Sequence, residues 1–396
     1  MQKPLSGIRV LEMGQLIAGP FAAKMLAEFG AEVIKIEAPE KGDPLREWRL
    51  LHQGTSVWWQ VQSRNKKSVT LDLRQPEAQE VIRALVQEVD VVVENFKPGT
   101  LEGWGLGWED LHAINPRLVM LRVSGYGQTG PYRDRPGFGV IGEAMGGLRH
   151  LSGEKGRAPV RVGVSIGDSL SALHGVIGVL LALRSRDQHS GKGQMIDVAL
   201  YESVFNMMES LLPEYSVFDE IRQPAGSELP GISPSNAYLC QDGKYVLIAG
   251  NGDSIYQRLM QAIGRTDLGE DPALVSNAGR AAQSERIDAA INAWTGQHSQ
   301  AEVLEQLTAA RIPVGRVYDV ADIAADPHYL ARDMILDSTL PDGTPVKVPG
   351  IVPKLSETPG EIRHKAPLLG EHTDEVLESV GIRAEQRDAW RKRGII

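Results

Sequence analysis

A single aspartate, Asp168, stands where the chain could hold a carboxylate for nucleophilic chemistry. It ends the glycine-rich stretch 163–168 and comes directly before a long apolar helix pattern over residues 170–183. The free backbone N–H groups and the positive end of a helix stabilise a carboxylate at such a place. The local sequence allows two interpretations: a helix cap, the commoner role of aspartate there, and a nucleophile held on a rigid turn.

Ser165 lies in a second pattern, G-x-S-x-G over residues 163–167, which is typical of the nucleophile elbow of serine hydrolases. A short strand pattern, Val160–Val162, precedes it, and the helix pattern follows, as the elbow requires. A catalytic triad also needs a downstream acid and histidine. His174 and His189 follow, but neither stands in a distinctive setting and no His-Gly-Gly motif lies upstream. A serine hydrolase is therefore the weaker alternative.

Two other kinds of chemistry find no support in the sequence. The loop over residues 13–19 lacks the G-x-G-x-x-G pattern of dinucleotide-binding enzymes, and Glu37 alone is a weak sign of a ribose-binding acid. The nine histidines form no H-E-x-x-H motif, and Cys240 is the only cysteine. The sequence thus predicts neither a catalytic metal site nor a disulfide.

The composition is that of an ordinary soluble protein. The 396 residues carry a formal net charge of −9 and contain no run rich in lysine and arginine, which argues against nucleic acid and anionic membranes as partners. The longest apolar run, around residues 176–183, is too short to span a bilayer, and the N-terminus has no signal-peptide pattern. We expect a cytoplasmic protein that binds neither nucleic acid nor membrane.

Strand and helix patterns alternate through the first half of the chain, which predicts an open α/β fold with a parallel sheet. Ligands of such folds bind at the carboxyl ends of the strands. The loop 95–99 follows one such strand, so it is a candidate ligand-binding loop. The predicted strands cover residues 8–12, 32–37, 68–72, 90–94, 118–123 and 195–200, and helix patterns follow at 21–29 and 76–88.

A stretch rich in proline, glycine and serine, residues 223–235, reads as a linker to a smaller α+β domain. That domain has a hairpin pattern ending in the strand 245–249, directly followed by Gly250-Asn251-Gly252. Its helix patterns cover residues 254–263, 284–294 and 301–310.

Several segments, read together, carry a resemblance through most of the chain. They are residues 5–12, 18–20, 26–37, 42–44, 65–73, 93–99, 125–131, 167–168 and 191–199. In order and spacing these segments resemble the class III CoA-transferases, the family of formyl-CoA transferase and carnitine CoA-transferase. That family also includes the α-methylacyl-CoA racemases.

The resemblance implies an interlocked homodimer in which each chain threads through its partner. Each chain would have a large Rossmann-like CoA-binding domain at residues 1–222 and a small α+β domain with its linkers at residues 223–325. The C-terminal segment, residues 326–396, would return to the large domain.

The resemblance also implies the chemistry. Asp168 would attack an acyl-CoA thioester to form an aspartyl–acyl anhydride, and CoA would then reach a small carboxylate or dicarboxylate acceptor through an aspartyl-CoA thioester. CoA is a substrate in this reaction, and no tightly bound cofactor is implied. The family match thus favours the nucleophile over the cap for Asp168. A CoA-binding module without catalytic activity is a further alternative.

Site residues follow from the same match. The implied contacts to CoA are Ile17, Ala18, Leu71, Arg74, Asn95, Phe96 and Lys97, with Arg135 close to the site; Phe138, Gly250, Asn251 and Gly252 are implied on the substrate side.

The chain departs from the family at several places. Ala38 and Gly103 stand where formyl-CoA transferases carry basic residues, and Arg135 is a candidate replacement. Racemases carry a Gly-His-Asp sequence where this chain has Gly137-Phe138-Gly139. Phenylalanine cannot transfer a proton, so we expect CoA transfer without exchange of the α-hydrogen.

Overall fold

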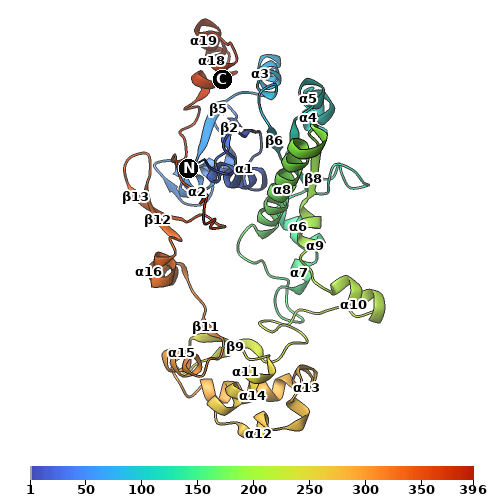
Figure 1. Ribbon diagram of the computed structural model, residues 1–396, viewed down its shortest axis with the longest axis vertical. Helices are drawn as coiled ribbons and strands as arrows, with labels where there is room; N and C mark the ends of the chain where they lie inside the picture. Colours follow the sequence, from blue (N-terminus) through green and yellow to red (C-terminus); the bar gives the residue numbers. More distant parts are fainter. Residues whose placement is uncertain (1) are drawn as a thin grey trace. The chain divides into compact units, whose positions relative to one another are not determined.

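The computed structural model describes residues 2–396, which divide into two compact units (Figure 1). Unit 1 comprises the chain up to Arg149 with Arg161–Glu220 and Ala331–Ile396, and unit 2 comprises His150–Val160 and Ile221–Leu330. The sequence places residues 150–160 in the large domain, whereas here they belong to unit 2. The reason is a pairing across the linker, where Glu154 and Ala225 form an antiparallel bridge.

Unit 1 is built on a six-stranded parallel sheet with the order β5-β2-β1-β6-β7-β8. In chain order this is 3-2-1-4-5-6, the arrangement of a doubly wound sheet. The predicted α/β fold is thus confirmed, and the six strands predicted for the parallel sheet are all present within two residues of their expected bounds. The strands are β1 (Arg9–Glu12), β2 (Glu32–Glu37), β5 (Lys66–Thr70), β6 (Val91–Glu94), β7 (Val119–Ser124) and β8 (Met195–Ala199).

Helices bury both faces of this sheet. On one face α1 (Ala18–Glu28) packs against α8 (Ile166–Ser185), and α8 runs beside β7 and β8 (Figure 1). On the other face lie α3 (Pro76–Val86), α5 (Trp108–Ile114) and α18 (Thr373–Ser379), so the C-terminal segment packs on unit 1. Side chains that alternate along each strand enter the two cores in turn, which explains the continuous apolar strand patterns.

One segment of residues 2–396, Ile166–Ser190, is long and apolar enough by length and composition to cross a membrane. It extends well beyond the apolar run that the sequence singled out. Ala172, Val176 and Val179 of α8 are nevertheless buried in the core shared with α1 and the sheet. The helix therefore forms part of the core of unit 1.

Shorter elements complete unit 1. They are η1 (Pro44–Glu47), β3 (Leu51–His52), β4 (Thr55–Ser56), α2 (Val57–Gln62), α4 (Thr100–Gly103), α6 (Gly139–Met145), η2 (Arg186–Ser190), α9 (Leu200–Phe205), α10 (Leu211–Phe218), β12 (Ile335–Thr339), β13 (Pro345–Pro349) and α19 (Ala384–Lys392). Two helices, α7 (Leu148–Leu151) and α17 (Pro327–Ala331), each include a boundary between the units along the chain.

Unit 2 has a three-stranded antiparallel sheet, β11-β10-β9, packed against helices around Tyr238, Leu259 and Ile291. Its strands are β9 (Ser235–Leu239), β10 (Tyr245–Ala249) and β11 (Val314–Arg316). Its helices are α11 (Asp253–Ala262), α12 (Thr266–Gly269), η3 (Pro272–Leu274), α13 (Asn277–Ala282), α14 (Ser284–Thr295), α15 (Gln300–Ala309) and α16 (Val320–Ala325).

Candidate active site

A cavity of about 500 Å³ opens in unit 1 beyond the carboxyl ends of β1, β6 and β7. β1 and β6 are the neighbours at which the strand order reverses, and doubly wound folds bind their ligands at that point. The cavity is lined by Gln15, Leu16, Ile17, Ala18, Trp48, Arg49, Asn95, Phe96, Lys97, Val123, Ser124, Gly125, Gly137, Phe138, Gly139, Val140, Arg161, Gly163, Val164, Ser165, Asp168 and Leu200.

Asn95 joins the two loops at the reversal point. Its Oδ1 accepts a hydrogen bond from the Gln15 amide at 2.7 Å, and its Nδ2 donates to the Gln15 carbonyl at 2.9 Å. Space is tight here, because a Cβ at Gly14 would lie 3.0 Å from Oδ1 of Asn95. The loop after β1 is therefore fixed to the end of β6, with Ile17 and Ala18 on the cavity wall.

A buried network of ion pairs also holds the loop after β1 in place. The Nζ of Lys35 lies 2.8 Å from Glu12 and 2.8 Å from Asp43, and it donates to the Gly14 carbonyl. Asp43 in turn accepts the amide of Leu16, whose φ of 62° is in the left-handed region. Burial alone would lower the pKa of Lys35, but the carboxylates of Asp43 and Glu12 raise it above its usual value. The network thus holds an unfavourable backbone conformation at the edge of the cavity.

Asp168 does not cap α8, and the prediction that it stands before the helix is wrong. The helix begins at Ile166 with Ser165 at the N-cap, so Asp168 is the third helical residue. The polar start of the helix, Ile166-Gly167-Asp168-Ser169, hides this turn from a search for apolar periodicity. The carboxylate lies on the cavity wall, where a nucleophile can meet a ligand.

The carboxylate of Asp168 is half-buried and lies against α6. A Cβ at Gly139 would come within 2.2 Å of Oδ2 of Asp168, so only glycine leaves room for the carboxylate. Burial and the negative charge of Glu143 raise the pKa of Asp168 to about 6, and the positive charge of Arg161 acts in the opposite direction. At neutral pH the group is mostly ionised, and it is more basic than an ordinary aspartate.

Ser165 lacks the setting of a nucleophile elbow. The predicted strand Val160–Val162 is absent, because these exposed residues pair with no strand of the sheet in the described part of the chain. No histidine is among the residues that line the cavity. The Nδ1 of His174 lies 3.0 Å from the carbonyl of Leu170 on its own helix. The geometry thus gives a serine hydrolase no support.

Seven of the predicted site residues come together on this one cavity. They are Ile17, Ala18, Asn95, Phe96, Lys97, Phe138 and Asp168. Three others do not line it: Leu71 is buried in the core, Arg74 forms an ion pair with Asp72 at 2.8 Å, and Arg135 stacks on Tyr132. Gly250, Asn251 and Gly252 follow β10 in unit 2, and their role in the site stays a prediction.

Sequence reasoning missed Arg49, Arg161 and Glu143. Arg49 and Arg161 line the cavity, and Glu143 is fully buried close behind it on α6. Arg161 lies in the segment that the sequence assigns to a strand, so nothing in the local pattern pointed to it. Only the fold brings Glu143 and Arg161 near Asp168 and places Arg49 on the same cavity.

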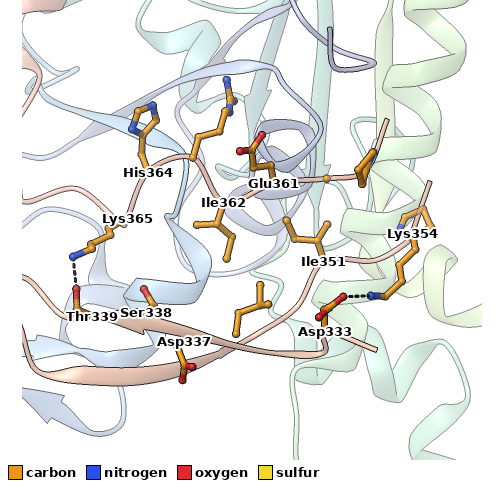
Figure 2. A pocket seen from close by; sticks show the side chains of 15 residues that line it. Asp333, Asp337, Ser338, Thr339, Ile351, Lys354, Glu361, Ile362, His364 and Lys365 are labelled. Carbon is orange, nitrogen blue, oxygen red and sulfur yellow. Dashed lines mark hydrogen bonds and ion pairs between the residues drawn. The ribbon is translucent and has the colours of Figure 1, made fainter. Parts of the chain in front are cut away.

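A second cavity of about 760 Å³ lies within the C-terminal segment of unit 1 (Figure 2). Figure 2 shows both of its lysines engaged with neighbours, Lys354 with Asp333 and Lys365 with Thr339. None of the predicted site residues lines it. Among residues 2–396 there is also no group of three or more His, Cys, Asp or Glu side chains that could hold a metal ion. The cavity around Asp168 is therefore the candidate active site.

Comparisons with known proteins agree with this site. The sequence model of CoA-transferase family III matches residues 5–373. The chain is 48% identical to a succinyl-CoA–D-citramalate CoA-transferase of Chloroflexus aurantiacus, over 95% of this chain and 93% of that protein. It is 44% identical to the beta subunit of a succinyl-CoA–L-malate CoA-transferase of the same organism, over 99% of this chain and 98% of that protein.

A solved structure shares the fold. The crystal structure of a CAIB/BAIF family protein from Brucella suis superposes with a TM-score of 0.84 at 33% identity, covering 96% of this chain and 100% of that one. The likeness extends over both units described above.

Proposed function

The chain belongs to CoA-transferase family III, and from this premise we propose that it moves CoA from succinyl-CoA to a small dicarboxylic acid through covalent intermediates on Asp168. The observation that carries the proposal is the place of the Asp168 carboxylate. It shares one cavity with Asn95, Phe96 and Lys97, the residues that the family match assigns to CoA.

The substrate class is suggested by the relatives. The two Chloroflexus enzymes are named for succinyl-CoA as one substrate and for citramalate or malate as the other. Both acceptors are small hydroxy acids with two carboxylates. A cavity with the cations Arg49, Lys97 and Arg161 on its wall suits such anions.

The proposed steps balance without an external acid or oxidant. Asp168 attacks the thioester carbonyl, the C–S bond breaks, and an aspartyl–succinyl anhydride forms with CoA thiolate. The thiolate attacks the aspartyl carbonyl, which releases succinate and leaves an aspartyl-CoA thioester. The acceptor carboxylate then attacks the carbonyl of that thioester, its C–S bond breaks, and an aspartyl–acceptor anhydride forms with CoA thiolate. The thiolate attacks the acceptor carbonyl of this anhydride, which yields the new acyl-CoA and frees the Asp168 carboxylate. Holding carboxylate and thioester together lowers the barrier, because the reaction becomes effectively intramolecular.

We also propose that the chain works as an interlocked homodimer. Support comes from large apolar side chains left exposed on unit 1, Ile177 and Leu181 on α8 and Phe218 on α10. Surfaces of this kind mark interfaces between chains. Light scattering at micromolar concentration should show a dimer that separates only on unfolding. A stable monomer contradicts the proposal, and so does a requirement for a second, different subunit.

The direct test is an assay of wild-type protein with succinyl-CoA and a panel of acids that includes citramalate, malate, succinate and acetate. Transfer to dicarboxylic acids is expected, and the Asp168→Asn variant should lose it while Ser165→Ala keeps it. Treatment with succinyl-CoA and then hydroxylamine or borohydride should modify Asp168 and leave Ser165 unmodified. Binding of CoA without transfer to any acid would instead indicate a non-catalytic module.

A further inference from the structure

Arg161 presents an uncommitted guanidinium to the cavity that holds Asp168. Its side chain is 46% exposed and lines the cavity. It forms no hydrogen bond with any of residues 2–396 whose contacts are described, and its ion pair with Oε1 of Glu143 is long, at 3.8 Å. The five N–H donors of the guanidinium are therefore available to a ligand.

Glu143 fixes where this cation lies. The carboxylate is fully buried, and its Oε2 accepts a hydrogen bond from Nε of Arg149 at 3.2 Å. Its other oxygen, Oε1, has no hydrogen-bond partner in the described chain and faces Arg161. An anchored, incompletely neutralised carboxylate attracts Arg161 without saturating its donors. The guanidinium thus stays close to Asp168, which follows Arg161 by seven residues along the same segment.

The other two cations of the cavity lie elsewhere. Lys97 follows β6 directly after Asn95 and Phe96, and Arg49 follows η1 beside Trp48. Both belong to the loops beyond β6 and β2, whereas Arg161 belongs to the segment that leads into Asp168. The positive charge of Arg161 lowers the pKa of Asp168, which agrees with a position close to that carboxylate.

We propose that Arg161 binds the free carboxylate of the dicarboxylic substrate, the one that takes no part in the exchange. A planar guanidinium with free donors pairs with a carboxylate through two parallel hydrogen bonds, which fixes the orientation of the acyl chain as well as its charge. The inference rests on the proposed transfer of CoA between dicarboxylic acids. Arg161 would then select a dicarboxylic acyl group over an apolar acyl group of the same length.

The test compares succinyl-CoA with butyryl-CoA, which replaces the free carboxylate by a methyl group. The measured quantity is the rate of covalent labelling of Asp168 per unit donor concentration, followed by mass spectrometry with hydroxylamine trapping. Wild type should prefer succinyl-CoA, and R161Q should lose roughly 100-fold with succinyl-CoA but less than about 3-fold with butyryl-CoA. R161K, which keeps the charge but not the paired donors, should lose roughly 10-fold with succinyl-CoA alone.

Two further variants separate this role from others. Arg157→Gln removes an arginine that pairs with Glu154 in unit 2 and does not line the cavity, and it should leave the preference unchanged. Arg49→Gln should lower the labelling rate of Asp168 by the same factor with succinyl-CoA and with butyryl-CoA. If R161Q does not fold, as judged by thermal unfolding, R161K carries the comparison.

The outcomes are distinguishable. Equal losses of R161Q with both donors, or no loss with either, overturn the role of Arg161 while leaving the transferase intact. Wild-type protein that is labelled by neither donor and moves CoA to no dicarboxylic acid overturns the proposed function itself, and the inference with it.

Discussion

The backbone of Gly139 lies against the carboxylate of Asp168, so closely that a Cβ at position 139 would stand 2.2 Å from Oδ2 and 2.9 Å from Cγ. Gly139 is the first residue of α6, and Asp168 lies in the first turn of α8. The two helix starts therefore meet at the Asp168 carboxylate. Because the φ of Gly139 is not in the left-handed region, alanine there is acceptable to the backbone and is excluded only by this carboxylate.

Gly139→Ala should displace the Asp168 carboxylate and reduce CoA transfer by about 100-fold, the cost expected for a nucleophile moved by about an ångström. The free energy of unfolding should change by less than about 3 kcal/mol, since the half-buried carboxylate can turn toward the cavity. Gly103→Ala is the matched control, because nothing lies within 4 Å of its added Cβ. Full activity of Gly139→Ala would mean that the carboxylate does not depend on this contact.

Asp168→Asn should stabilise the protein above neutral pH. The pKa of Asp168 is about 6 in the folded protein and close to 4 in an unfolded chain, so folding favours the protonated form. At pH 8 the carboxylate is ionised in both states, and its raised pKa in the folded state lowers the free energy of unfolding by the full amount, about 2–3 kcal/mol. Below about pH 4 both states are protonated and the difference vanishes. Urea unfolding of wild type and Asp168→Asn at pH 4 and pH 8 measures the difference in their free energies of unfolding. Equal values at pH 8 would contradict the raised pKa.

The sequence patterns were sufficient for the sheet and for the loop at the end of β6, for a physical reason. Strands buried on both faces leave continuous apolar runs, such as Val91–Glu94, and the loops at their ends follow from the parallel topology. Asn95 could therefore be placed at the carboxyl edge, where the cavity lies, whereas Ile17 came only from the family resemblance.

What the sequence could not supply depends on tertiary contacts. Val160–Val162 alternates like a strand but finds no neighbour in the sheet, and the polar first turn of α8 conceals that Asp168 is already helical. Glu143 and Arg161 are eighteen residues apart along the chain, and neither local sequence pattern predicts that they form an ion pair. Their contact comes from the packing of α6 against α8.

Glu143→Gln should move the acid limb of the pH–activity profile to lower pH. The proposed mechanism requires ionised Asp168, whose pKa is raised to about 6 by burial and by the negative charge of Glu143. Glutamine keeps the shape and removes the charge, so the pKa of Asp168 should fall and more of the nucleophile should be ionised at pH 5.5. The measurement is the ratio of single-turnover rates at pH 5.5 and pH 7.5, which should rise. Glu154→Gln, in unit 2, should leave the ratio unchanged, and a lower ratio for Glu143→Gln would reverse the assigned effect.

Asp43→Asn should destabilise the fold and loosen the loop after β1, which carries the proposed CoA contacts Ile17 and Ala18. Lys35 would keep only Glu12 as a close anionic partner, and losing one member of a buried pair costs about 3–5 kcal/mol. The amide of Leu16 would also lose its anionic acceptor, so KM for acyl-CoA should rise more than kcat falls. Glu80→Gln is the comparison, because the exposed pair of Glu80 with Arg83 should contribute less than about 1 kcal/mol. Similar unfolding free energies for both variants would show that the network does not hold the loop.

Wild-type protein should transfer CoA without exchanging the α-hydrogen of its substrate. A racemase removes that proton with a positioned base pair, whereas anhydride exchange on a carboxylate takes no proton from carbon. Phe138 and Gly139 cannot act as bases, and the residues that line the cavity include Asp168 but no histidine. Incubation with (2R)-2-methylacyl-CoA in deuterated water, read by mass spectrometry, should therefore show no deuterium at the α-carbon on the timescale of transfer. Deuterium incorporated at a turnover rate, with no CoA reaching any acid, would assign the cavity to racemisation and leave Asp168 as an acid–base group.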